Sequence, residues 1–169
     1  LQVGMGSATE AARAMQFLRD TSKELGLDLR ESSLQFSRLA AAAKGTKLEG
    51  QATRDAFLGV SKAAVALGLS ADEAGGALLA IQQIISKGKV SLEELSGQLG
   101  ERLPGALQIA ARAMGMTVEE LNKLVSTGNL TAEQLLPRLA GELEKTFGAQ
   151  AQTAASGLQS QINRFNTAL

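Results

Sequence analysis

The chain has 169 residues, with 17 basic and 17 acidic side chains and no histidine, cysteine, tyrosine or tryptophan. Without imidazole or thiol groups it has no disulfides and no His-containing metal site, and most hydrolase chemistry is excluded. The charge balance argues against nucleic-acid binding that depends on neutralising phosphates.

The composition favours helix throughout, because alanine and leucine dominate while there are only five phenylalanines and two prolines. No stretch approaches the roughly 18 consecutive apolar residues of a membrane span, and no signal peptide is evident. Because the chain starts at Leu1, we expect it to be a piece of a longer protein.

Two kinds of residue mark helix boundaries along the chain. A Ser or Thr with Glu or Gln three residues later predicts a capping box at a helix start. These pairs are Ser7 with Glu10, Ser70 with Glu73, Ser91 with Glu94, Thr117 with Glu120, and Thr131 with Gln134. Glycines that follow apolar-periodic stretches predict helix ends. These are Gly26, Gly45, Gly68, Gly88, Gly115, Gly128 and Gly148.

In chain order, these signals predict nine helices. They lie near residues 8–25, 30–44, 48–67, 71–87, 92–100, 105–114, 118–127, 132–147 and 150–168. Pro104 stands at the first turn of a predicted helix, where its missing N–H costs nothing. The expected fold class is therefore all-α, a compact bundle of eight or nine short helices joined by tight, glycine-capped turns.

Apolar residues recur at helical spacing on most of these segments, as expected for faces that pack into a core. The clearest stripes are Phe57, Val60, Ala64 and Leu67; Ala74, Leu78, Ile81 and Ile85; and Leu136, Leu139, Leu143 and Phe147. Short helices are only marginally stable when isolated in water, so we expect residues 70–148 to form a compact domain. Residues 1–69 would form an N-terminal helical segment, and residues 149–169 a C-terminal heptad helix or linker.

A ten-residue phrase occurs twice, as Ser86–Leu95 and as Ser126–Leu135. In each copy a glycine ends one helix, an apolar residue follows, and a hydroxyl residue starts the next helix. Two copies are too few for a solenoid, which needs about three or more repeats. We interpret them as a duplicated joint, or as two joints that share the same capping chemistry.

The sequence changes character at Ala149, after which Arg164 is the only charged residue. Apolar residues then step by four and three, at Ala151, Ala155, Leu158, Ile162, Phe165 and Leu169. The pattern is typical of a coiled coil but covers fewer than three heptads. Two interpretations stay open: a coiled coil that continues past Leu169, or a last amphipathic helix lying on the domain.

Carboxylates are the only side chains left that could carry acid–base catalysis. The pairs Glu93/Glu94 and Glu119/Glu120 lie in first turns of predicted helices, where acidic groups favour the helix dipole. Neighbours on a helix point about 100° apart, so neither pair can converge on a shared proton. We therefore predict no catalytic, cofactor-binding or metal-binding residues, and no cofactor.

Other polar and small residues also have structural explanations. Gly75 and Gly76 follow no predicted strand, so they do not resemble a phosphate-binding loop and instead predict close approach of a second helix. Lys87 stands at a helix C-terminus, where a cation is favourable.

An ordered series of short motifs between residues 84 and 147 is similar to one protein family. The motifs are Ser86–Val90, Glu93–Leu95, Gly97–Glu101, Leu103–Ala106, Ala110–Gly115, Thr117, Glu120–Leu121, Gly128 and Leu135–Pro137. Together they resemble the N-terminal domain of phage and prophage tail tape measure proteins. Residues 68–83 also fit the family, whereas residues 1–60 match it only in general terms.

The resemblance implies a structural domain of a chain that sets tail length during tail assembly and is released with the DNA at ejection. Implied partners are tail tube and tail tip proteins and an assembly chaperone, and the full-length chain would be a homo-oligomer. The implied location is the virion tail, assembled in the host bacterial cytoplasm. No nucleic-acid site, membrane segment or enzymatic activity is expected in this piece.

Two other classes of function stay open. A non-catalytic helical interaction module, or adaptor, would need a persistent apolar groove for a partner helix. An enzyme would need a cleft with converging polar groups, for which this composition offers few candidates.

Overall fold

The computed structural model describes the backbone of residues 2–168 and the side chains of residues 8–157. Within this range the chain forms eight α-helices, one π-helix and an isolated bridge between Lys89 and Thr131. The elements are α1 (Gln2–Leu25), α2 (Leu29–Ala43), α3 (Gln51–Leu67), α4 (Ala71–Lys87), η1 (Glu93–Leu99), α5 (Gly100–Arg102), α6 (Ala106–Ala113), α7 (Val118–Ser126) and α8 (Ala132–Ala168). The predicted all-α fold class is confirmed.

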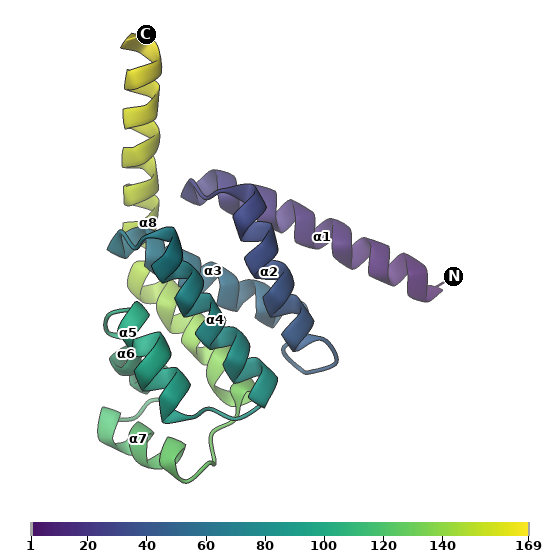
Figure 1. The fold of residues 1–169 in the computed structure, drawn as a ribbon, viewed down its shortest axis with the longest axis vertical. Coiled ribbons are helices and arrows are strands. Elements are labelled where there is room, and N and C mark those ends of the chain that lie inside the picture. The colour runs from purple at the N-terminus through teal and green to yellow at the C-terminus, as the bar shows by residue number, and fades with distance from the viewer. Residues whose placement is uncertain (1, 169) are drawn as a thin grey trace.

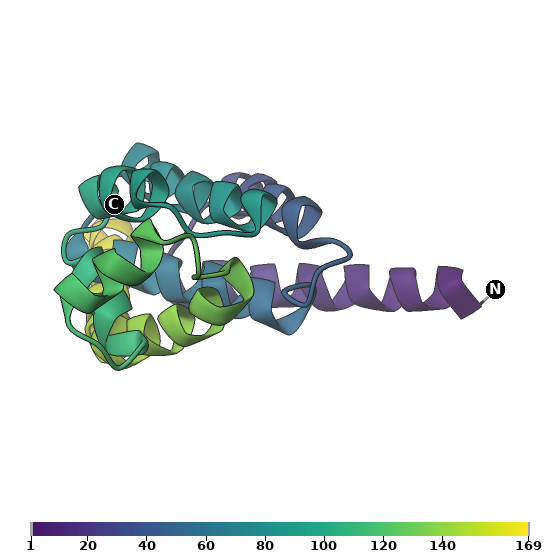
Figure 2. The same cartoon turned by 90° about the horizontal axis from the view of Figure 1, so that it is seen from below.

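Most of the helices pack into one body, from which the two terminal helices project. Figure 1 shows α8 leaving the body in one direction and α1 in another, so that the two termini lie far apart. Figure 2 shows the first half of α1 extending beyond the other helices. None of the helices in the described part of the chain is both long enough and apolar enough to span a membrane.

The centre of the body is the contact between α3 and the first half of α8. Phe57 of α3 and Leu139 and Leu143 of α8 are each 1% exposed. A Cβ added to Gly59 would approach the carbonyl oxygen of Ala140 to 3.2 Å and the Cβ of Leu143 to 3.3 Å. Glycine at this position therefore allows the two helices to pack closely.

An aromatic cluster joins α1 to α2 and α3. The ring centroid of Phe17 lies 5.6 Å from that of Phe36 and 6.0 Å from that of Phe57, and Phe36 and Phe57 meet edge to face at 5.6 Å. Tilted and edge-to-face contacts are the favourable arrangements for aromatic rings. Arg54 of α3 also bonds Glu10 of α1 at 2.6 Å. These contacts hold α1 on the body from Glu10 onward.

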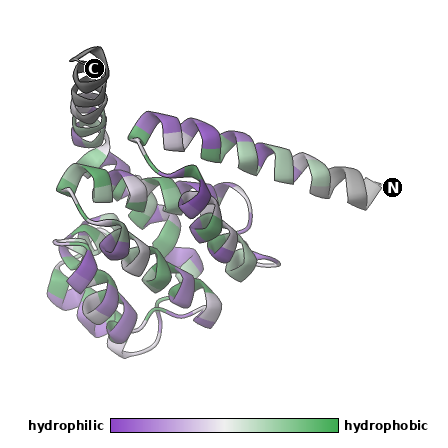
Figure 3. Ribbon diagram, turned by 45° about the horizontal axis from the view of Figure 1, so that its top comes forward, coloured by the Kyte–Doolittle hydropathy of each residue, from purple (hydrophilic) through white to green (hydrophobic). Residues whose placement is uncertain are grey.

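The predicted apolar stripes on α3, α4 and α8 are confirmed as core faces, because ten of their twelve residues are buried and Leu67 and Ala74 are partly buried. Figure 3 shows hydrophobic and hydrophilic residues side by side along the helices of the body, as amphipathic helices require. One cluster of buried side chains extends from Leu18 to Phe147, so residues 1–69 and 70–148 both contribute to it. The division of the chain at residues 69 and 148 concerns how isolated segments fold, and it stays a prediction.

Two predicted helix boundaries and one predicted helix type are wrong. α1 already begins at Gln2, so the predicted cap at Ser7 lies inside a helix. The predicted helix 92–100 is the π-helix η1 followed by the single turn of α5. α8 runs through Gly148, where we expected an end. Ala151, one turn further on, is 0% exposed, and its burial favours continuing the helix over the cost of about 1 kcal/mol for an internal glycine.

The C-terminal heptad is described only in its first positions. Ala151 and Ala155 are buried, and the side-chain amide of Gln150 donates to the carbonyl oxygen of Ala66 at 3.3 Å. This part of α8 therefore lies on the end of α3. The remaining heptad positions, Leu158, Ile162, Phe165 and Leu169, lie outside the described side chains, and the coiled coil stays a prediction.

The close approach of α3 and α8 is testable by adding volume at Gly59. We expect Gly59→Val to lower the free energy of unfolding by about 1–3 kcal/mol, because the backbone of Ala140 cannot move aside as a flexible side chain would. Gly141→Ala is the matched control on α8. Nothing lies within 4 Å of a Cβ at Gly141, so this change should raise stability by about 0.5–1 kcal/mol. Urea unfolding measures both, and an unchanged midpoint for Gly59→Val would contradict the proposed close packing.

Candidate functional site: the paired helix joints

The two copies of the repeated phrase lie side by side and pair with each other. The backbone N–H of Val90 donates to the carbonyl oxygen of Leu130 at 2.9 Å, and the N–H of Ala132 donates to the carbonyl oxygen of Gly88 at 3.0 Å. These two bonds form the antiparallel bridge between Lys89 and Thr131. The sequence predicted each joint separately but did not predict that the joints meet.

The paired joints have the same local geometry. Gly88 and Gly128 both have φ of 74°, a left-handed conformation that glycine adopts without a steric penalty. The apolar residues two positions later, Val90 and Leu130, are 2% and 1% exposed. In each joint a helix therefore ends at a glycine and one apolar side chain is buried directly after it, as the sequence predicted.

The joints differ in how the following helix begins. In the second joint the N–H of Gln134 donates to the hydroxyl of Thr131 at 3.2 Å, and the N–H of Thr131 donates to the side chain of Gln134 at 3.1 Å. This is the predicted capping box. In the first joint the hydroxyl of Ser91 instead donates to the carboxylate of Glu94.

Glu94 is a buried carboxylate with two side-chain donors. Its side chain is 1% exposed, and it accepts hydrogen bonds from the ammonium of Lys87 and the hydroxyl of Ser91. Burial acts to raise the pKa of Glu94, but the bonds from Lys87 and Ser91 outweigh it and hold the pKa below its ordinary value of 4.5. The hydrogen bond between Lys87 and Glu94 also raises the pKa of Lys87.

From the sequence we explained Lys87 by its favourable position at a helix C-terminus, and we did not identify Glu94 as its partner. Burial of Glu94 depends on η1, where the chain follows a π-helix rather than the predicted α-helix. Leu95 and Leu99 in the same segment are both 0% exposed. A Lys seven residues before a Glu is the only signal that could have suggested the contact.

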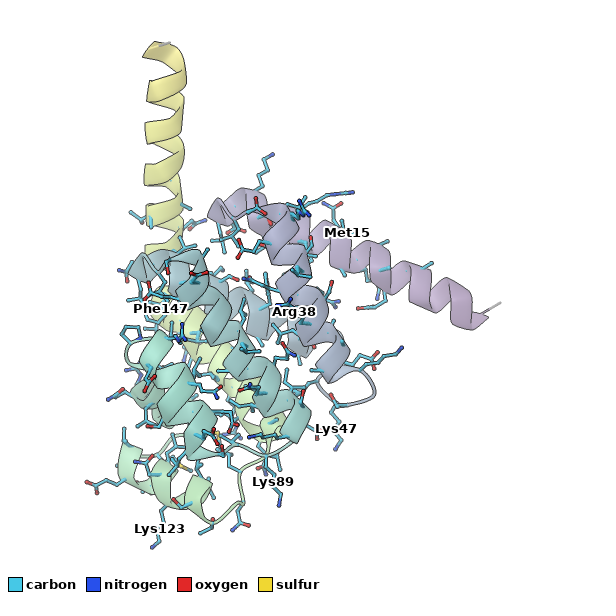
Figure 4. All side chains as sticks on the ribbon, in the orientation of Figure 1. Met15, Arg38, Lys47, Lys89, Lys123 and Phe147 are labelled. Atoms are coloured by element: carbon cyan, nitrogen blue, oxygen red, sulfur yellow. The ribbon has the colours of Figure 1, made fainter. Side chains whose placement is uncertain are left out.

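A third connection reaches the same end of the body. The backbone N–H of Lys47, between α2 and α3, donates to the carboxylate of Glu133 in the first turn of α8 at 3.3 Å. Figure 4 labels Lys47 and Lys89 at this end. Three connecting segments therefore meet around the start of α8.

Other polar residues considered as candidates from the sequence make structural contacts. Two further predicted capping boxes, Ser70 with Glu73 and Thr117 with Glu120, are confirmed. The bond from the Ser70 backbone, with one from its hydroxyl, lowers the pKa of Glu73.

Glu93 and Glu119, the neighbours of Glu94 and Glu120, are exposed. In each adjacent pair one carboxylate makes a local hydrogen bond, and in the second pair that carboxylate, Glu120, is itself exposed.

We expected a second helix to pack closely against Gly75 and Gly76 of α4, and the structure differs. Side chains, not a helix backbone, come closest: a Cβ at Gly76 would lie 3.0 Å from the guanidinium of Arg102, and one at Gly75 would lie 3.2 Å from the amide nitrogen of Gln35. These glycines let Arg102 and Gln35 lie against α4.

The polar contacts of the paired joints hold helix ends and connections in place. The carboxylate of Glu94 is enclosed and already accepts two donors. The remaining contacts are backbone hydrogen bonds and caps. The fold thus defines an all-helical domain in which hydrogen bonds join one connection to another.

Comparison with known proteins identifies the family. A family profile described as "Tape measure protein" matches residues 1–169. The "Probable tape measure protein" of Salmonella phage Felix O1 is 36% identical over 169 aligned residues, which cover 96% of this chain. The chain spans 22% of the length of that curated relative. No solved structure matches the chain.

The chain belongs to the tape measure protein family. The resemblance that we found over residues 84–147 is confirmed, and the match extends over residues 1–60, which the motifs covered only in general terms.

The buried carboxylate gives a pH-dependent prediction. We expect Glu94→Gln to lower the free energy of unfolding at neutral pH by about 1.5–3 kcal/mol, because it weakens two charge-assisted hydrogen bonds. A folded-state pKa below 4.5 stabilises the fold above pH 4.5, and this contribution is lost as the pH falls through the folded-state value. The difference between wild type and Glu94→Gln should therefore shrink in acid.

Glu93→Gln is the matched control, since Glu93 is the exposed neighbour, and it should change stability by no more than about 0.5 kcal/mol. Urea unfolding across the acid range measures all three proteins. Equal losses from the two substitutions, or a difference that stays constant with pH, would contradict the assignment.

Proposed function

We propose that this chain is a structural domain of a phage or prophage tail tape measure protein, part of the chain that sets tail length during tail assembly and is released at DNA ejection. The observation that carries the proposal is the family match over residues 1–169. The name of the Felix O1 relative supports it. Because the chain spans 22% of that relative, the role of the whole protein is inferred rather than observed.

Within that protein, this domain would be a globular element rather than the ruler. A ruler made of helix grows by 1.5 Å per residue, so 169 residues in one straight helix would measure about 250 Å. Here most of the helices fold back around a single core cluster. Length measurement would then be the task of extended helix elsewhere in the protein.

We infer that the domain has no catalytic role and needs no cofactor. The carboxylates that could have served as acid or base are used in structural contacts, with Glu94 in the first joint and Glu73 and Glu120 in capping boxes. The backbone hydrogen bonds between the paired joints, which hold the start of α8 in place, support the same inference.

The partners and location follow from the proposed role. We infer contacts with tail tube and tail tip proteins, assistance from an assembly chaperone, and a homo-oligomeric full-length chain. The protein would reside in the virion tail after assembly in the host bacterial cytoplasm. The adaptor alternative would instead require a groove that receives a helix of an unrelated partner.

Tail length after an in-frame deletion tests the proposal. The deletion is made in a helical region of the full-length protein outside this domain, and tails are measured by electron microscopy. We expect tails to shorten by about 1.5 Å per residue removed.

Gly59→Val in the full-length protein is the companion variant, since it perturbs the domain without changing chain length. Tails that do form with it should keep the parental length. Unchanged length after the deletion, or the absence of any tail from the source genome, would overturn the tape measure role and favour the adaptor.

A further inference from the structure

A pocket opens where α2 and α4 begin beside the end of α3 (Figure 1). Its volume is about 440 Å³, which lies within the range of about 300–1,000 Å³ that is typical of small-ligand pockets. Val60 and Ala64 of α3 and Leu78 of α4 line it, and each is no more than 5% exposed. These side chains give the pocket an apolar wall against which an aliphatic chain can pack.

The opposite wall carries polar groups on one face of α2. Asp28, Glu31, Ser32 and Gln35 all line the pocket, and their spacing of three and four residues places them side by side on the helix. Ser61 adds a hydroxyl from α3. The pocket is therefore amphipathic, with apolar side chains along α3 and α4 and hydrogen-bonding groups along α2.

Two of the polar groups are buried hydroxyls that lack a protein partner. Ser32 is 4% exposed and Ser61 is 6% exposed, and neither hydroxyl bonds any residue of the described part of the chain. Neither oxygen belongs to the fully enclosed unpartnered atoms of that part, so both are reached from the pocket. A buried polar group without a partner is unfavourable, and a ligand that bonds these hydroxyls therefore gains affinity.

The charge that lines the pocket is negative. Among the described residues, Asp28 and Glu31 are the only charged ones in its walls, and neither forms an ion pair within residues 8–157. Asp28 and Ser70 already cap the starts of α2 and α4 with their own side chains. The helix N-termini at the pocket are thus occupied, and the two carboxylates disfavour an anion.

Three arginines lie near the pocket but do not line it. Arg30 lines a separate hollow on α2, and Arg38 and Arg102 line another hollow between α2 and α4. Glu31 lines both hollows as well, yet none of the three arginines forms an ion pair with it in the described part. Its one side-chain contact is a long hydrogen bond of 3.5 Å from Gln35. Because a carboxylate has two acceptor oxygens, Glu31 keeps capacity for a cation that a ligand brings.

We propose that this pocket binds a primary ammonium group on an aliphatic chain, the chemistry shared by a lysine side chain and a free alkylamine. An ammonium has three donors and no acceptor, which complements the carboxylate of Glu31 and the hydroxyls of Ser32 and Ser61. The acceptors come from two helices, so a compact ammonium with rotatable donors fits them better than a planar guanidinium. The aliphatic chain packs on the apolar wall of α3 and α4.

Titration of the 169-residue chain with n-pentylammonium tests the proposal. Amide NMR resonances report the binding, with 1-pentanol as the uncharged analogue and pentanoate as the anionic one. We expect pentylammonium to shift the amide resonances of Ser32 and Ser61 saturably and to bind about tenfold more tightly than either analogue. No saturable binding, or equal binding of pentylammonium and pentanol, would overturn the proposal.

Removal of the charge at Glu31 tests the electrostatic part of the site. Glu31→Gln should raise the dissociation constant for pentylammonium about fivefold or more, because a neutral amide replaces a charged acceptor. Glu119→Gln is the matched control, since Glu119 is an exposed carboxylate of α7 that does not line the pocket. An unchanged affinity in Glu31→Gln, or an equal loss in the control, would overturn the assignment.

Ser61→Ala separates a ligand-binding hydroxyl from a structural one. The variant should bind pentylammonium more weakly, while its urea midpoint should be unchanged or higher because the hydroxyl has no protein partner to lose. A lower urea midpoint with unchanged affinity would assign the hydroxyl to the fold and overturn its role in binding.

A lysine peptide distinguishes the two sources of the ammonium group. Binding of acetyl-Ala-Lys-Ala-amide at least as tight as that of pentylammonium would support a lysine of a partner protein, whereas pentylammonium binding with the peptide excluded would support a free amine. None of these measurements involves tails. Their failure would leave the tape measure role standing, and the deletion experiment does not decide what the pocket binds.

Discussion

The packing of α3 against the first half of α8 is the contact on which the rest of the structure depends. Gly59 lets the helices approach closely, and the ammonium of Lys62 pairs with Glu144 across the same contact at 2.7 Å. α8 also contacts α6, α4 and α1. α3 and α8 are separated by more than sixty residues of chain, so this contact is long-range. α8 in turn gives the short helix α6 a surface to pack on.

The paired joints add a second set of contacts, at the start of α8. The start of α8 is fixed by backbone bonds to the first joint, and Lys47 adds a bond from the connection between α2 and α3. Glu94, held by Lys87 and Ser91, adds a charge-assisted contact within the first joint. These bonds restrain the start of α8 relative to two other connections. This is a physical reason for the repeated phrase that the family resemblance alone did not supply.

Local interactions were predicted well, and predictions failed where a local signal met a longer-range one. The caps at Ser70, Thr117 and Thr131 depend on residues three positions apart, and all three are present. Gly148 satisfied the local rule for a helix end, yet α8 continues because the residues beyond it are buried against α3. Ser91 satisfied the rule for a cap, yet its hydroxyl bonds the buried carboxylate of Glu94.

By itself the sequence determined the all-helical class, most helix boundaries and the core faces, because helix propensity, caps and apolar periodicity act over one or two turns. Its ordered motifs also indicated the family. Tertiary structure alone decided that the two joints pair, that Glu94 is buried and that α2, α3 and α4 enclose a pocket. These features bring together residues that are distant in the chain or set the angle at which helices cross, and no local pattern encodes either.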